Sequence, residues 1–210
     1  MFRNREEAGR ILADELSRYR NDPTALILAL PRGGVAVGYQ LSLALQIPLD
    51  VFITRKIGAP GNPEYAIGAV TETGSHYLNQ EAISSFGLSQ HELNRLIQVQ
   101  EKEIARRRNL YREGRLLPQL TGRTVLLVDD GIATGSTFMA SALAIRSLQP
   151  RHLVGVIPVG PPSTIREVRS HVDELVVLMT PDSFETVGNF FMDFTQVEDR
   201  DVIQYLKLAD

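Results

Sequence analysis

The chain has 210 residues, of which 43% are hydrophobic, carries a formal net charge of -3 and contains no cysteine. This length and apolar content suffice for one domain with a full hydrophobic core. The lack of cysteine excludes disulfides, thiolate metal sites and a cysteine nucleophile, and the small negative charge argues against a general nucleic-acid coat. No apolar run approaches the ~18 residues of a membrane span, so we expect a cytoplasmic protein without a membrane partner.

The first half of the chain predicts helices and strands in alternation. In order, we expect a helix over residues 4–19, a strand over 25–30, a helix over 35–45, weaker strands over 49–54 and 66–70, and a long helix over 89–111. Asn4 with Glu7 has the three-residue spacing of a capping box at a helix start. Ser89 with Glu92 repeats this spacing at the start of the long helix. The glycine- and proline-rich stretch 58–63 predicts a loop between the two weaker strands.

The second half of the chain predicts the same alternation more strongly. In order, we expect a strand over residues 125–128, a helix over 136–148, a strand over 153–159, a helix over 163–171, a strand over 175–179 and a helix over 198–206. These strands are nearly unbroken apolar runs, which are typical of a parallel sheet covered on both faces by crossover helices. We therefore predict one α/β domain over residues 1–210, with a core over about 22–180 and an irregular appendage over about 181–195.

A polar loop joins a buried strand to a helix in the segment Val125–Thr137. Asp129 and Asp130 follow the strand, where open parallel sheets bind ligands, and carboxylates accept hydrogen bonds from vicinal sugar hydroxyls. After Gly131 and Ile132 come five small or hydroxyl residues, namely Ala133, Thr134, Gly135, Ser136 and Thr137. They lie where a helix begins, and a helix N-terminus attracts an anion. A site for a diol next to a site for a phosphate fits a ribose 5-phosphate, which we predict as the ligand of this loop. The alternative is a purely structural role, in which the aspartates only turn the chain and cap the helix.

At these residues the sequence closely resembles the type I phosphoribosyltransferases, whose signature is an apolar strand, two acidic residues, and then Thr-Gly with a hydroxyl residue. The resemblance implies a mostly parallel sheet flanked by helices, with a flexible loop over about 55–65 and a small C-terminal hood over about 181–195. It implies that Asp129 and Asp130 hold the ribose hydroxyls of 5-phosphoribosyl 1-pyrophosphate (PRPP), while Ala133–Thr137 cradle its 5-phosphate. The helical segment over about 80–115 looks like an insertion of a less characterised branch.

The implied activity is magnesium-dependent transfer of the phosphoribosyl group to a nitrogenous base, with release of pyrophosphate. The base is a purine or a related acceptor. Its identity stays open, because Ala133 stands where the oxopurine enzymes of this family carry an acidic residue. Two alternatives also stay open: a regulator that senses PRPP or a nucleotide and binds RNA, and a hydrolase that uses water as the acceptor. Proteins of this fold often form dimers, so a homodimer is one expected state.

Paired glycines link another strand to a helix. Gly33 and Gly34 stand at the predicted helix start, where they can present successive N–H groups to an anion, although such a pair is also common in a simple tight turn. In the family that the chain resembles, this position is the pyrophosphate loop. Arg32 would then add a charge-assisted contact.

Cations, glycines and prolines are mixed in the segment Thr54–Tyr65. Such a segment is either a mobile lid, since glycines permit hinge angles, or a plain exposed loop. Resemblance to the family's flexible catalytic loop implies a lid that brings Arg55 and Lys56 near the pyrophosphate. The same resemblance makes Glu64 a candidate partner for proton transfer with the acceptor base.

Aromatic residues are frequent in the predicted hood. Aromatic rings offer faces on which a planar base stacks, and packing is the equal alternative. The segment looks like the hood of the oxopurine phosphoribosyltransferases, although its internal spacing is longer. The resemblance implies that Phe184 stacks on the base, with Phe190 and Phe191 as further base-binding candidates, and that Asp193 helps to position a metal ion.

The predicted long helix carries a cluster of arginines. They are Arg106, Arg107, Arg108, Arg112 and Arg115. We interpret them mainly as a solvated face paired with Glu101 and Glu103, and RNA contact or an oligomer interface are the alternatives. Because the chain as a whole is acidic, nucleic acid is not an expected partner.

Overall fold

The computed structural model describes residues 1–209, apart from the side chain of Glu64. Its centre is a five-stranded parallel sheet with the strand order β2-β1-β6-β7-β8. In that order the strands are Leu49–Val51, Ala25–Ala29, Thr124–Val128, His152–Val159 and Glu174–Met179. The predicted α/β fold with a parallel sheet is confirmed.

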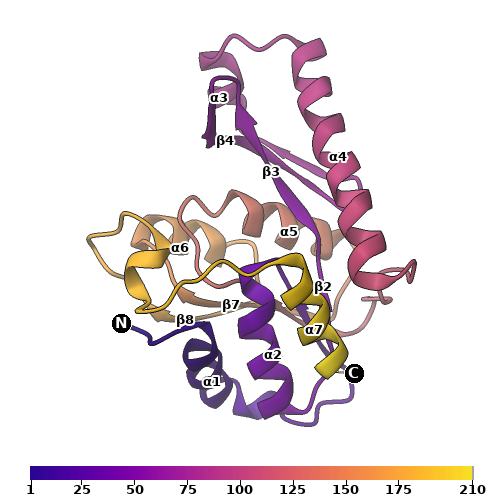
Figure 1. Ribbon diagram of the computed structural model, residues 1–210, viewed down its shortest axis with the longest axis vertical. Coiled ribbons are helices and arrows are strands. Elements are labelled where there is room, and N and C mark those ends of the chain that lie inside the picture. Colours follow the sequence, from indigo (N-terminus) through magenta and orange to yellow (C-terminus); the bar gives the residue numbers. More distant parts are fainter. Residues whose placement is uncertain (210) are drawn as a thin grey trace.

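Helices cover both faces of this sheet (Figure 1). One face packs against α1 (Arg5–Glu15), α2 (Gly33–Leu45) and α7 (Asp199–Ala209), and the other against α5 (Ser136–Ser147) and α6 (Pro162–Arg169). Neighbouring residues of a strand point to opposite faces, so a sheet that is covered twice requires strands without polar positions. Strands β1 and β6 are buried at every residue, which is the reason that their apolar runs are unbroken.

Residues 54–112 form a second unit, which we call the arm, and it rises from the end of the parallel sheet (Figure 1). It contains an antiparallel sheet of β3 (Thr54–Ala59), β4 (Asn62–Thr71) and β5 (His76–Leu78). The helices of the arm are α3 (Gln80–Ser85) and α4 (Gln90–Arg112). Helix α4 runs along the whole arm and reaches α7 of the core. Strand β5 and helix α3 were not predicted.

Residues 55–65, over which we predicted a flexible loop, are not irregular, because β3 and β4 pair over most of this segment as a hairpin. Two of its glycines meet steric demands of the hairpin. A Cβ on Gly58 would lie 2.4 Å from the carbonyl oxygen of Pro63, so glycine permits the close approach of the two strands at a bulge. Gly61 has a φ of +76° in the turn at the hairpin tip.

Helix caps agree largely with the sequence. Ser89 and Glu92 form the complete capping box of α4. At α1, the Asn4 side chain accepts a hydrogen bond from the Glu7 backbone N–H at 2.9 Å. The Glu7 carboxylate, however, accepts from the backbone and side chain of Arg3, so the reciprocal half of the predicted box is absent from α1. A short 3₁₀ turn, Ser17–Tyr19, continues the α1 segment.

The segment 181–195 is irregular, as predicted, apart from a 3₁₀ turn over Val187–Phe190. It packs on the N-terminal residues, because Phe2 forms a bridge with Phe191 in a small cluster of buried apolar side chains.

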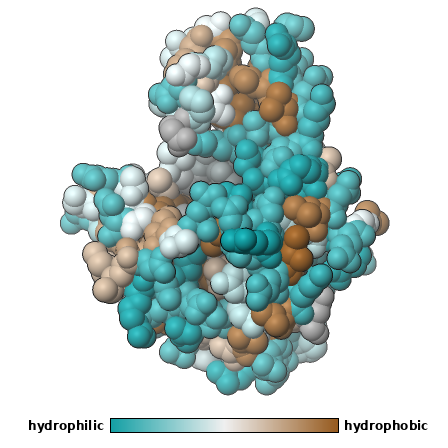
Figure 2. Space-filling view, viewed as in Figure 1, coloured by the Kyte–Doolittle hydropathy of each residue, from teal (hydrophilic) through white to brown (hydrophobic). Residues whose placement is uncertain are grey.

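None of the described helices is both long and apolar enough to cross a bilayer. Figure 2 shows a hydrophobic patch near the top of the arm. The exposed large apolar side chains of the arm include Phe86 and Val99.

Candidate active site

The loop after β6 forms an open cradle at the start of α5. Residues 131–138 and Asp129 line a cavity of about 130 Å³ there. Gly135 caps α5 with a φ of +72°, a conformation that favours glycine. Thr134 is exposed, and its hydroxyl lies 3.3 Å from that of Ser136. Hydroxyls and a helix N-terminus therefore face one small cavity, as an anion site requires.

Two carboxylates stand beside this cradle. Asp129 Oδ1 accepts a hydrogen bond from the Asp130 backbone N–H at 2.9 Å. Burial and the neighbouring Asp130 carboxylate raise the pKa of Asp129 well above its ordinary value. The Asp130 carboxylate accepts a hydrogen bond from Arg5 Nε at 2.6 Å. The pair is therefore held in place by backbone and by one cation.

The paired glycines after β1 touch these carboxylates. A Cβ on Gly33 would lie 1.8 Å from Asp130 Oδ2, and one on Gly34 would lie 2.8 Å from the carbonyl oxygen of Val128. A side chain at position 34 would collide with backbone, and one at position 33 would displace the Asp130 carboxylate. The peptide bond between Pro31 and Arg32 is cis. The first turn of α2 and the end of β6 consequently form one continuous edge of the site.

Arg5 was missed by the sequence reasoning. Besides its ion pair with Asp130, it donates to the Thr195 carbonyl at 2.8 Å, and its guanidinium lies 3.7 Å from the centre of the Phe194 ring. It therefore connects the N-terminal helix, the loop after β6 and the hood. The sequence does contain a sign that Arg5 has a special role. Arg5 is the first residue of α1, where the positive end of the helix dipole disfavours a cation, so a partner elsewhere in the fold is expected.

The predicted hood residues do not share one environment. The rings of Phe184 and Phe190 stack on each other with centroids 5.2 Å apart. Phe191 is only 6% exposed and packs between Phe2 and Phe194, so its ring faces are not open to a ligand. The base-binding prediction for Phe191 is therefore wrong, and packing, the alternative, describes it.

Asp193 also lies in the hood. Its carboxylate accepts hydrogen bonds from the Thr195 backbone at 2.9 Å and hydroxyl at 2.6 Å, and these bonds lower the pKa of Asp193. It shares a cavity of about 210 Å³ with Arg5 and Tyr205. That cavity also reaches Ala36 on α2, so Asp193 lies on the side of the site formed by α1 and the hood.

The predicted lid cations lie on strand β3. Arg55 is half-buried and donates to the side-chain oxygen of Gln100 on α4 at 3.2 Å. Burial and the nearby Arg107 guanidinium lower the pKa of Arg55. Lys56 is partly exposed on the same strand. The side chain of Glu64 lies outside the described residues.

The family model for the phosphoribosyl transferase domain matches residues 3–194. The chain belongs to this family. The match includes both strand-end loops, the arm and most of the hood. The family resemblance that the motif at Asp129–Thr137 indicated is therefore confirmed.

Relatives of this phosphoribosyl transferase domain extend the same conclusion. Two Mycobacterium tuberculosis proteins, each named "Putative phosphoribosyl transferase", are 37% identical over 209 residues, which is 100% of this chain and 47% of theirs. The chain thus spans about half the length of these curated relatives. The crystal structure of TT1426 from Thermus thermophilus is 37% identical, with a TM-score of 0.81 over 98% of this chain and 97% of that one. The AQ2163 protein from Aquifex aeolicus, at 13% identity and TM-score 0.55 over 96% of this chain and 84% of that one, shares the fold.

The arginines of α4 form the expected solvated face only in part: Arg106 and Arg108 are exposed, and Arg106 pairs with Glu103 as predicted. Arg107 and Arg112 are buried, with exposed fractions of 8% and 1%. Arg112 pairs with Glu72 and with Asp50, and Arg107 pairs with Glu103 at 2.7 Å. Glu101 lies near His76 and, among the residues described, makes no ion pair with an arginine. Because these arginines bind inside the phosphoribosyl transferase domain, the helix does not present a five-arginine surface to RNA.

Magnesium suits the carboxylates of this site only in part. Among the residues that the structure describes, no group of three or more His, Asp or Glu side chains is arranged to hold a metal ion. Magnesium usually takes one or two carboxylates and completes its shell with substrate phosphates and water. Asp129 and Asp130 fit this smaller demand, since they offer adjacent carboxylate oxygens beside the cradle.

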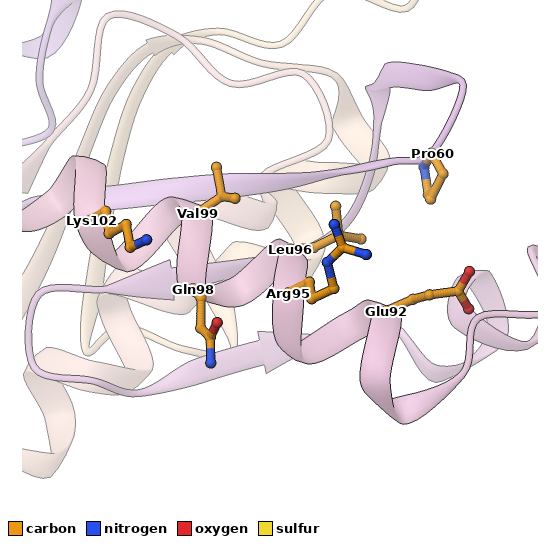
Figure 3. Close-up of a pocket in the computed structure, with 7 residues that line it drawn as sticks. All are labelled: Pro60, Glu92, Arg95, Leu96, Gln98, Val99 and Lys102. Carbon is orange, nitrogen blue, oxygen red and sulfur yellow. The ribbon is translucent and has the colours of Figure 1, made fainter.

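A larger cavity, of about 430 Å³, lies on the arm (Figure 3). It is bounded by Pro60 of the hairpin and by one side of α4. The α4 residues that line it are Glu92, Arg95, Leu96, Gln98, Val99 and Lys102. None of these residues belongs to the loops after β1 and β6, so this cavity is separate from the candidate active site.

Proposed function

We propose that this chain transfers the phosphoribosyl group of PRPP to a nitrogenous base, a purine or a related acceptor, and releases pyrophosphate. The observation that supports this most is the contact between the two strand-end loops. Gly33 packs so closely on Asp130 that any side chain there would collide with the carboxylate. The carboxylate pair, the phosphate cradle and the N-terminus of α2 therefore lie along one edge, where they could meet the diol, the 5-phosphate and the pyrophosphate of a single PRPP molecule.

The ribose 5-phosphate part of the donor would be held by groups of two kinds. Asp129 and Asp130 accept hydrogen bonds from the ribose 2- and 3-hydroxyls. Residues Ala133–Thr137 and the N-terminus of α5 bind the 5-phosphate through backbone N–H groups and hydroxyls. Arg5, at 2.6 Å from Asp130, fixes this carboxylate before the donor arrives, so less order has to be created on binding.

The pyrophosphate would lie against Gly33, Gly34 and Arg32 at the N-terminus of α2, whose positive dipole end favours an anion. Asp129 and Asp130 would provide protein ligands for a magnesium ion there. Bound magnesium would neutralise charge that develops on the pyrophosphate as it leaves.

In the reaction, the acceptor nitrogen forms a bond to C1 of the ribose while the bond from C1 to the pyrophosphate oxygen breaks. Positive charge develops on the sugar, and the acceptor nitrogen gives up its proton. We assign Arg55 and Lys56 to the pyrophosphate side and Glu64 to the proton of the acceptor. Hydrogen bonds connect the arm to the cradle, since Thr54 Oγ1 lies 2.8 Å from Ser141 Oγ and Ser141 donates to the Thr137 carbonyl at 2.7 Å.

Calorimetric titration of PRPP, with and without magnesium, tests the proposal, followed by pyrophosphate release against purine, pyrimidine and other nitrogen acceptors. We expect magnesium-dependent binding and release that requires an acceptor. Asp130→Asn should weaken binding and turnover while leaving the fold intact. Release without any base would indicate a hydrolase, binding without release would indicate a sensor, and a chain that binds no PRPP would contradict the proposal.

A further inference from the structure

Four arginines from three parts of the chain meet where the arm joins the core. Arg32 Nη1 lies 3.8 Å from Asp199 Oδ1, and Arg106 Nη2 lies 2.9 Å from Asp199 Oδ2. Arg106 and Arg107 both donate to Glu103, at 2.8 and 2.7 Å. The fourth member, Arg55 on β3, is close enough to Arg32 and Arg107 for their charges to act on it. The glycine loop, the arm hairpin and helix α4 therefore converge on one cluster.

This cluster has more cations than its own carboxylates neutralise. Four guanidinium groups stand against Glu103 and Asp199, an excess of two positive charges. Within the described part of the chain, Arg55 has a neutral partner, Gln100, and no ion pair. Burial, and after it the charge of Arg107, lower the pKa of Arg55, so its surroundings disfavour the charged form. A bound anion would offset this cost.

The carboxylates hold the arginines in place. Hydrogen bonds from Arg106 and then from Arg107, which outweigh partial burial, lower the pKa of Glu103 to about 2, so it is ionised at neutral pH. Asp199 accepts hydrogen bonds from Arg106 and from Tyr111 Oη at 2.6 Å. Arg107 is 8% exposed, so its guanidinium cannot turn freely into solvent. The cluster is thus arranged before any ligand binds, which lowers the entropy cost of binding.

We propose that Arg107 of helix α4 binds the pyrophosphate end of the donor together with Arg32 and Arg55. This inference rests on the proposed function, and it deepens it by giving the long helix of the arm a part in the active site. The planar guanidinium matches two phosphate oxygens at once, which suits Arg107 to a diphosphate. Glu103 would compete with the diphosphate for Arg107 and would hold the guanidinium when no donor is present.

The test uses two separate probes on the full chain. Magnesium pyrophosphate and ribose 5-phosphate are titrated in turn, and the variants are Arg107→Gln, Arg107→Lys, Glu103→Gln and the control Arg108→Gln. Arg108 lies next to Arg107 on α4 but is exposed. We expect Arg107→Gln to weaken pyrophosphate binding about tenfold or more, with ribose 5-phosphate binding unchanged. Arg107→Lys should keep part of the affinity, and Arg108→Gln should keep all of it.

Glu103→Gln separates binding from a merely structural role. If Arg107 binds pyrophosphate, removing the competing carboxylate should tighten pyrophosphate binding. If the cluster only fastens α4 to α7, Glu103→Gln should weaken pyrophosphate binding or leave it unchanged. Either result would overturn the inference. Arg107→Gln, Arg107→Lys and Glu103→Gln each test the inference independently. If one of these variants fails to fold, the others still decide it.

The two proposals fail in different ways. A wild-type chain that binds ribose 5-phosphate but not pyrophosphate, or an Arg107→Gln variant with undiminished pyrophosphate affinity, would refute the role of Arg107 and leave the proposed function standing. A chain that binds neither probe would remove the proposed function as well.

Discussion

The parallel sheet and the arm are stabilised in different ways. Strands β1 and β6 are apolar and buried at every position, and helices close both of their faces. Strand β3 includes partly exposed positions among its buried ones, and Arg55 on it reaches α4. The arm also buries apolar side chains, such as Ile57 and Ile104, but its base adds a buried ion pair, since Arg112 and Glu72 pair with almost no exposure.

This difference matches the parts that the two regions take in the proposed site. The edge of the parallel sheet offers short carboxylates, hydroxyls and backbone N–H groups, which require accurate backbone placement. The arm offers long cations, which reach the site from α4 and β3. A rigid apolar core suits the first group of ligands, whereas the second depends on how firmly the arm is attached. Variants that disturb one region and leave the other intact separate these two dependences.

The largest effect on stability is expected from Arg112→Ala, which removes the ion pairs that fasten the arm to the core. Arg112 donates to Asp50 at 3.0 Å, to Glu72 and to the Val51 carbonyl. Despite burial, the hydrogen bonds to Glu72 and Asp50 raise the pKa of Arg112, so it stays charged. Its loss leaves the Glu72 carboxylate buried without a cation, which should lower the free energy of unfolding by about 3–5 kcal/mol. Urea denaturation measures this difference.

Arg115→Ala is the matched control, because Arg115 follows on the same segment and is exposed. It should change the free energy of unfolding by less than about 0.5 kcal/mol. If both variants lose the same stability, the ionic junction does not hold the arm. The comparison between an apolar core and an ionically fastened arm would then be lost.

Contiguous features were predictable from the sequence. The strands of the parallel sheet, the loop at Asp129–Thr137 and the glycines at Gly33–Gly34 each carry their signal within a few residues, and their positions were predicted. The arm was harder, because glycine and proline at Gly58 and Pro63 look the same in a loop and in a bulged hairpin. Partners far apart in the chain were not predictable at all, as Arg5 and Asp130 are separated by 125 residues.

The same limit explains the arginines of α4. A helical pattern shows which residues share a face, but it does not show what that face meets. Helix α4 packs on β3, β4 and α7, and Arg107 and Arg112 are buried there rather than solvated. Their charge suggested a solvated face, and only tertiary contacts supply the surroundings that allow them to be buried.

Asp129→Asn should change binding and stability in opposite directions. In the free chain, burial and the Asp130 carboxylate raise the pKa of Asp129. The neutral form of Asp129 therefore stabilises the folded state, and this contribution is fully present below the pKa of an aspartate in the unfolded chain, about 3.9. That stability is lost as the pH rises through the higher folded pKa. The amide is neutral at every pH, so the variant should be more stable at pH 8 by about 1 kcal/mol.

The same substitution should weaken PRPP binding about tenfold or more, because the amide has one accepting oxygen in place of two and carries no charge. Denaturation from pH 5 to 9 and titration of PRPP measure the two effects. The stability difference should grow with pH. An Asp129→Asn variant that is less stable than the wild type at pH 8 would show that the carboxylate pair is not strained.

Gly33→Ala tests the close contact between the two loops. The added Cβ would lie 1.8 Å from Asp130 Oδ2, so the carboxylate must rotate away from Arg5. We expect PRPP affinity to fall about tenfold, with a stability change within about 1 kcal/mol. Gly74→Ala is the control, since its φ of +81° strains alanine while its Cβ position is open. It should cost about 1 kcal/mol of stability and leave affinity unchanged. Equal affinities in the two variants would contradict the proposed role of the glycine loop.

The smallest effect is expected at the contact between α4 and α7. Tyr111→Phe removes the hydrogen bond to Asp199, and it should lower the free energy of unfolding by about 1 kcal/mol. Burial and this bond raise the pKa of Tyr111, so the contribution is present below the unfolded pKa of about 10. It is lost as the pH rises through the higher folded pKa.

Tyr205→Phe is the control, because Tyr205 lies on α7 and its hydroxyl makes no hydrogen bond to the residues described. Chemical denaturation at pH 7 and pH 10.5 compares the two variants. If Tyr111→Phe costs no more than the control, the arginine cluster alone connects α4 to α7. If it costs more and also weakens pyrophosphate binding, the link that fastens the arm also positions the cations, because Asp199 holds both Arg106 and Arg32. In that case the stability of the arm and its part in the site have the same cause.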